Sequence, residues 1–191
     1  GVVKITKTVF AVLTSRKSTV HNQKRYVYFD ELGPGNIPQT SNGNHSYDVV
    51  SWYLQWSGRS PNIEAIHHSV ANASPSRVGD VVVAPQRRTL PALMSWQPII
   101  KYTIWGVGVS IIAALDLLRG RWWYALLLNQ AALAAQIRHL PVDALAREYL
   151  FHNSGWIYRP LWTYEAEVKK SRIIFYFYGV NIETFKTKDG Y

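Results

Sequence analysis

A hydrophobic stretch over residues 98–137, near the middle of the 191-residue chain, constrains the fold more than any other feature. Its first half carries only Lys101 and Asp116 as charged side chains, and the run 122–137 carries none. Neither half shows a polar stripe at helical spacing, and a helix that is apolar on all sides is buried either in protein or in lipid. The polar sequence Arg119-Gly120-Arg121 separates the two halves as a turn. We therefore predict a helical hairpin.

The hairpin fits two environments. As helices, 102–118 and 122–137 would be about 25 Å and 24 Å long, about one turn short of a bilayer core. A buried helix pair in a water-soluble fold explains the same residues. The alternative is contact with lipid, either permanent or after release from the fold, as in some pore-forming toxins. The side chains predicted to contact the membrane are the flanking aromatic and charged residues Tyr102, Trp105, Asp116, Arg119, Arg121, Trp122 and Trp123. Asp116 is predicted to pair with Arg119.

The charge balance points to negatively charged partners. The chain has 21 Lys plus Arg against 12 Asp plus Glu, a formal net charge of +9, which favours binding to an anionic membrane surface, an acidic protein or nucleic acid.

The chain has no cysteine, which excludes disulfides, thiolate metal sites and a thiol nucleophile. The sequon at Asn44 is a predicted glycosylation site and, with the hairpin, favours a secreted, organellar or membrane-associated location over a plain cytoplasmic one.

The flanking segments predict an α+β fold, with an antiparallel sheet from the N- and C-terminal segments packed round the central hydrophobic helical hairpin. We expect a single domain over 1–191, with a β-rich part at 1–90 that includes one short helix, a helical part at 98–152 and a C-terminal β part at 160–191. The strand predictions, from alternating apolar, β-branched and aromatic residues, are 2–13, 25–29, 78–84, 162–168, 173–178 and 180–185. The segment 47–56 fits either a strand or a helix. Short helices are predicted at 60–74, capped by Ser60-Pro61, and at 142–151.

On that first short helix, Glu64, His67 and His68 would share a face and form a candidate metal site. The nearest second pair, Glu148 and His152, has a different spacing. The alternative for the histidines is that His67 packs inward and His68 is solvated.

No catalytic residue can be assigned, no cofactor is predicted, and a non-enzymatic role is favoured. The chain has no nucleophile elbow and no P-loop or dinucleotide fingerprint. Gly33-Pro34-Gly35 is interpreted as lying outside the strand-to-helix context that a phosphate-binding turn needs.

The leading functional hypothesis is a basic membrane-associated protein that uses the 98–137 hairpin. It would act by toxin-like insertion or as a subunit of a membrane complex, with oligomers forming on the membrane. The alternative is a nucleic-acid-binding or ribosome-associated structural protein, because basic clusters such as 169–172 lie near aromatic strands. A small metal-dependent enzyme is the third hypothesis.

Overall fold

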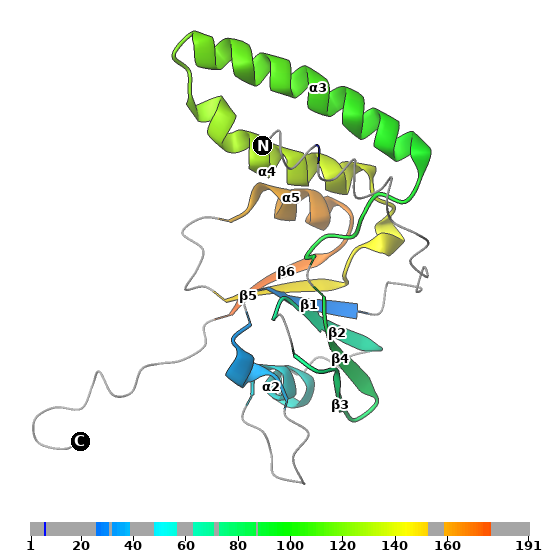
Figure 1. The fold of residues 1–191 in the computed structure, drawn as a ribbon. Helices are drawn as coiled ribbons and strands as arrows, with labels where there is room; N and C mark the ends of the chain where they lie inside the picture. The colour runs from blue at the N-terminus through cyan, green and yellow to red at the C-terminus, as the bar shows by residue number, and fades with distance from the viewer. Residues whose placement is uncertain are drawn as a thin grey trace, which may run out of the picture.

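A six-stranded sheet forms the centre of the computed structural model (Figure 1). The structure describes residues 6, 26–30, 32–38, 48–56, 63–70, 73–86, 88–152 and 159–176. The predicted strand 180–185 and the sequon at Asn44 lie outside them, as does the predicted strand 2–13 except for Thr6, which is helical and not extended. The strands are β1 (Tyr26–Asp30), β2 (Ala65–His68), β3 (Ser76–Val78), β4 (Val81–Pro85), β5 (Glu148–His152) and β6 (Arg172–Tyr176). Their order across the sheet is β3-β4-β2-β1-β5-β6.

Helices and a mixed sheet confirm the α+β class, but the predicted antiparallel arrangement is wrong. Among the described strands, only β3 and β4 pair antiparallel, whereas β1 pairs parallel with both β2 and β5, β2 with β4, and β5 with β6. Because both edges of β1 are occupied, this strand cannot be the hairpin partner predicted for residues 2–13. The apolar run Tyr26–Phe29 is buried, as expected for a strand covered on both faces.

Crossover helices join the parallel strands. Helix α2 (Val49–Trp56) connects β1 to β2, and α5 (Leu161–Val168) connects β5 to β6. Side chains alternate across each strand, so β1 contributes Val27 and Phe29 to the core beneath α2, and Tyr26 and Tyr28 to the core on the opposite face. The helices therefore cover both faces of the sheet.

The predicted helical hairpin is confirmed. Helix α3 (Trp96–Leu118) and helix α4 (Trp123–His139) pack against each other, and α4 packs in turn against α5. Helix α3 is the outermost element in Figure 1, with α4 and α5 between it and the sheet. It begins six residues before the predicted start at 102, because Pro98 fits in a first helical turn, where no backbone N–H is needed. Its 23 residues are about 34 Å long.

Three other segments differ from prediction. Residues 65–68 and 148–152 are strands and not parts of helices, because both are interior to the sheet and pair with a strand on each side. A short apolar run of this kind cannot be assigned to strand or helix by periodicity alone. Conversely, 161–168 is a helix despite its aromatic and β-branched residues, since Trp162, Thr163 and Ala166 share its buried face. The ambiguous segment 47–56 contains a helix.

Candidate functional site

The carboxyl ends of the parallel strands form the first candidate site. Strand β1 ends at Asp30, β5 at His152 and β6 at Tyr176. Asp30 lies in register with Phe151, one residue before His152. The His152 and Tyr176 rings meet edge to face with centroids 5.6 Å apart, and the Tyr176 ring lies 6.2 Å from that of Phe29. An acidic residue and two rings therefore lie where adjacent strands end: the His152 and Tyr176 rings on the α2 face and, by the alternation of side chains after Phe29, Asp30 on the opposite face.

This edge includes the topological switch point of the sheet. From β1 the chain proceeds through α2 to β2 and β4 on one side, and it then returns to the other side of β1 as β5 and β6. In open α/β sheets, ligands bind outside the carboxyl ends of the strands at such a reversal. The edge of the sheet at the carboxyl ends of β1 and β5 is thus the position that this topology favours for a ligand.

A glycine-containing turn follows β1 at the same edge. Residues Pro34–Asn36 form a single 3-10 turn (η2), and the Asn36 backbone N–H donates to the Gly33 carbonyl at 2.9 Å. Gly33-Pro34-Gly35 begins three residues after β1 ends, but a 3-10 turn and not an α-helix follows it, which agrees with the expectation that it lies outside a strand-to-helix context. The turn after the first strand is where doubly wound folds hold phosphate groups. Here the next helix, α2, begins only at Val49.

The structure does not bring Glu64, His67 and His68 together as a metal site. His67 and His68 are consecutive residues of β2, so their side chains lie on opposite faces of the sheet. The His67 ring contacts that of Tyr26 at 5.3 Å, on the face covered by α4 and α5. Within the described ranges, no group of three His, Asp or Glu residues is placed to hold a metal ion.

His68 is fully buried at the carboxyl end of β2 and not solvated as expected. Neither ring nitrogen has a hydrogen-bond partner among the described residues. Burial, with a smaller contribution from the neighbouring His67, lowers the pKa of His68. The ring is therefore neutral at physiological pH and packs among the apolar side chains on the α2 face.

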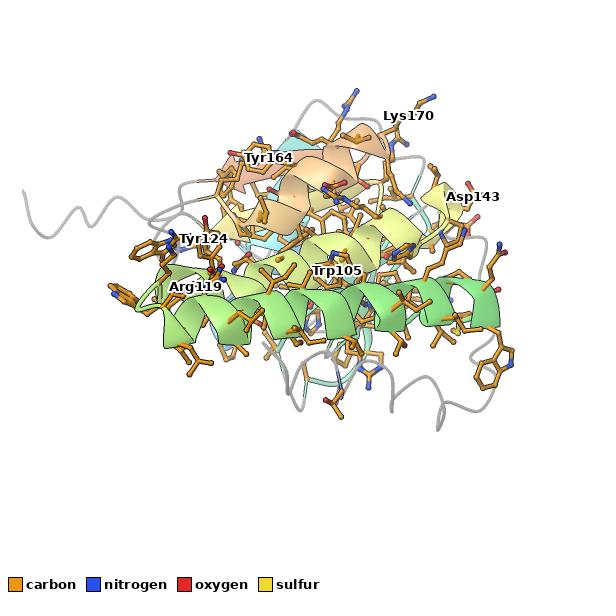
Figure 2. All side chains as sticks on the ribbon, turned by 90° about the horizontal axis from the view of Figure 1, so that it is seen from above. Trp105, Arg119, Tyr124, Asp143, Tyr164 and Lys170 are labelled. Carbon is orange, nitrogen blue, oxygen red and sulfur yellow. The ribbon has the colours of Figure 1, made fainter. Side chains whose placement is uncertain are left out.

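The hairpin turn is the second candidate site, and it contains most of the residues predicted to contact a membrane. Arg119 and Arg121 each place a guanidinium nitrogen 3.9 Å from the buried Asp116 carboxylate, which confirms the predicted Asp116–Arg119 pair. Both arginine side chains are more than half exposed, as is Trp122. Trp123 is also exposed, and its ring lies 6.2 Å from that of Trp122. Figure 2 shows Arg119 and Tyr124 at the same end of the hairpin.

Two of the predicted membrane-contacting residues point elsewhere. Tyr102 is buried between the helices, and its hydroxyl donates to the Ala132 carbonyl of α4 at 3.3 Å. The Trp105 ring is only half-buried and lies 5.8 Å from that of Tyr102, between α3 and α4 (Figure 2). These two rings hold the hairpin together and are not its exposed surface.

The larger exposed surface of α3 is a stripe of apolar side chains that we call the outer stripe. Its members recur every three or four residues: Trp96, Ile100, Ile104, Val107, Ile111, Leu115 and Leu118. The opposite side of the helix packs inward through Ile99, Tyr102, Gly106, Ala113 and Asp116. Of the helices in the described residues, α3 alone is long and apolar enough to cross a membrane, by length and composition.

Asp30, His152 and Tyr176 were missed from the sequence as site residues. A signal was present in the run Tyr-Val-Tyr-Phe-Asp, where an acidic residue ends an apolar strand and a glycine turn follows. That signal indicates a binding site only when the strand is central and parallel. Because residues 25–29 were predicted to be one strand of an antiparallel hairpin, the sequence did not point to Asp30.

Five parallel strands in the order β4-β2-β1-β5-β6, with helices on both faces, define a doubly wound sheet, an architecture that often binds nucleotides at its carboxyl edge. The chain also matches a family model described as "Polysaccharide biosynthesis PFTS motif protein" over residues 105–191, which is less than half of its length. Among the described residues, that match includes most of α3 and all of α4, β5, α5 and β6. No curated protein matches the chain, and no solved structure does.

Proposed function

We propose that this chain acts in polysaccharide biosynthesis and that the carboxyl edge of its sheet binds a nucleotide-activated sugar. The switch point between β1 and β5 is the observation that carries the proposal, since sheets of this topology bind nucleotides there. The family match supports the process. Formation of a glycosidic bond requires a sugar with a good leaving group, and a nucleoside diphosphate is such a group.

Each element of the edge has a chemical role in this proposal. The turn that contains Gly33 and Gly35 lets a phosphate approach the backbone closely, because neither residue has a side chain. The Asp30 carboxylate accepts hydrogen bonds from ribose or sugar hydroxyls. The exposed parts of the His152 and Tyr176 rings offer an aromatic surface to a base or a sugar ring.

Thermal unfolding of the 191-residue chain with diphosphate sugars of uridine, guanosine and thymidine tests the proposal. A nucleotide that binds only the folded state raises the melting temperature as its concentration rises. Asp30→Asn should weaken binding of the nucleotide sugar by about tenfold to a hundredfold, the value of a hydrogen bond to a charged group. Asp80→Asn is the matched control, because Asp80 is exposed in the β3–β4 turn, at the amino end of β4. If no nucleotide shifts the transition, or if both variants lose the shift equally, the site assignment is wrong.

The other functional hypotheses concern different surfaces. Membrane association concerns the hairpin and stays a proposal. Nucleic-acid binding stays a prediction, tested by whether RNA affinity falls steeply with salt.

A further inference from the structure

Helix α3 is apolar on two opposite sides, and among the described residues only one of these sides has a partner. The inner side is buried against α4, where the Tyr102 hydroxyl bonds to the Ala132 carbonyl. The outer stripe is exposed along the whole helix, from Trp96 at one end to Leu118, which is 84% exposed, at the other. Contiguous apolar surface of this extent marks an interaction site.

We propose that the outer stripe docks flat on an anionic membrane surface, with α3 parallel to the bilayer plane. The hairpin carries four basic residues, Lys101, Arg119, Arg121 and Arg138, and one acidic residue, Asp116. Asp116 is buried beneath Arg119 and Arg121, so these two guanidinium groups and Lys101 dominate the exposed charge. Basic side chains beside an exposed apolar face are the pattern of a helix that lies in the interface of an anionic membrane.

The aromatic residues at the two ends of α3 also favour a membrane surface as the partner of the outer stripe. Trp96 lies at the first residue of α3, and Trp122, Trp123 and Tyr124 lie at the hairpin turn, all of them exposed. Tryptophan and tyrosine side chains favour the headgroup region of a bilayer, because their rings combine an apolar body with a polar tip. Aliphatic residues fill the stripe between these two ends.

The anchoring of α3 favours flat docking over a span. Before α3, Leu93 is buried in the core shared by the sheet and the helices. After it, α4 is fixed to α5, because the Leu161 backbone N–H donates to Gln130 Oε1 at 3.3 Å and Arg138 pairs with Glu165. Both ends of α3 are therefore held by one domain, whereas a spanning helix would have its ends on opposite sides of the bilayer.

Flotation of the full chain with phosphatidylcholine vesicles, with and without phosphatidylglycerol, tests the docking. The wild type should float with the anionic vesicles. Replacing Ile104, Ile111 and Leu115 together by glutamine should lower the partition coefficient on the order of a hundredfold, because three apolar contacts are lost. The matched control is Val142→Gln with Val168→Gln, two exposed apolar residues away from α3. Arg119→Gln with Arg121→Gln should lower binding to anionic vesicles about thirtyfold, at about 1 kcal/mol per basic residue.

The orientation can be measured directly because the chain has no cysteine. A nitroxide attached to Ile100→Cys, Val107→Cys or Leu115→Cys should report one shallow depth at all three positions. A greater depth at Val107 than at the two flanking positions would instead show a span and overturn flat docking.

Two further results would overturn the proposal. One is failure of the wild type to bind either kind of vesicle. The other is a wild-type protein that does not bind vesicles but forms a dimer, when the triple glutamine variant is monomeric. That result would show that the outer stripe binds a second copy of the chain. Neither depends on nucleotide binding, so a failure here is distinct from a failure of the proposed sugar-nucleotide site.

Discussion

His68 is a buried imidazole whose two ring nitrogens have no hydrogen-bond partner among the described residues. A buried polar group without a partner lowers stability by about 1–3 kcal/mol. Replacing histidine by leucine removes that penalty, and a change of shape in a packed core costs less than about 1.5 kcal/mol. His68→Leu should therefore be neutral or stabilise the protein by up to about 2 kcal/mol at neutral pH.

The effect should grow as the pH falls. The pKa of His68 is lowered in the folded state, so below about pH 6.5 the unfolded chain binds a proton that the folded chain does not. Stability is thus fully present at higher pH and is lost as the pH falls. Lowering the pH beneath 6.5 should therefore increase the advantage of His68→Leu until the pH reaches the folded-state pKa of His68.

Urea unfolding of both proteins, followed by far-ultraviolet circular dichroism, measures this difference. Burial and nearby basic groups also lower the pKa of His139, so both proteins should carry His139→Gln. That background leaves His68 as the group that differs between them. A loss of more than about 2 kcal/mol in His68→Leu at neutral pH would show that the imidazole makes a stabilising polar contact, and the reasoning would be refuted. A difference in stability that does not change with pH would also refute it.

Two further predictions concern the framework of the fold. Tyr53→Phe should lower the free energy of unfolding by about 1.5–3 kcal/mol, because the Tyr53 hydroxyl donates to the buried Glu148 carboxylate at 2.8 Å. Arg172→Gln should cost less than about 1 kcal/mol, since its exposed guanidinium lies 3.6 Å from the same carboxylate; urea titration that gives equal losses would contradict this order. Gly120→Ala should destabilise the hairpin turn by about 1–2 kcal/mol, because Gly120 has φ of +77°. Gly108 lies in the exposed middle of α3 with open space round its Cα, so Gly108→Ala should instead stabilise the protein by about 0.5–1 kcal/mol. Thermal unfolding of the two alanine variants tests whether backbone strain decides if the substitution raises or lowers stability.

The hairpin was predictable because its evidence is local. Two apolar runs and a polar turn specify two helices and the sharp connection between them, and the Asp116–Arg119 pair follows from helical spacing. The sequence could not choose between protein and lipid as the surroundings, because α3 is apolar both on the side that packs against protein and on the side that is exposed. Its inner side packs on α4 and its outer stripe is exposed.

The sheet was less predictable because its pairing is non-local. The partners of β1 are 39 and 121 residues away at the paired positions Tyr26–Ala65 and Val27–Glu148. No local pattern states that β1 is central, and the buried run in β5 fits a helix as well as a strand. The site at the carboxyl edge depends on that pairing, so Asp30 and His152 could not be placed at one edge of the sheet without it.

The two proposed surfaces lie toward the same end of the molecule. Helix α5 starts near the carboxyl end of β5 and leads to the amino end of β6. Helix α4 runs beside α5 in the same direction, because Gln130 bonds to Leu161 at the start of α5 and Arg138 pairs with Glu165 further along. The start of α4 and the hairpin turn therefore lie above the carboxyl edge of the sheet, as Figure 1 shows.

The position of α3 in the topology explains why its surface is available. The chain must cross from β4 to β5, and α4 alone supplies the helix of that crossover that packs toward the sheet. Helix α3 lies outside the helix layer that covers the sheet, so its outer stripe is not needed to bury the core. A chain that docks through this extra helix would hold its proposed sugar-nucleotide site at the same end of the molecule as the hairpin turn, with α4 and α5 between the sheet and the membrane surface. The hairpin turn at Arg119 and Trp122 would then be the part of the docking surface nearest to that site.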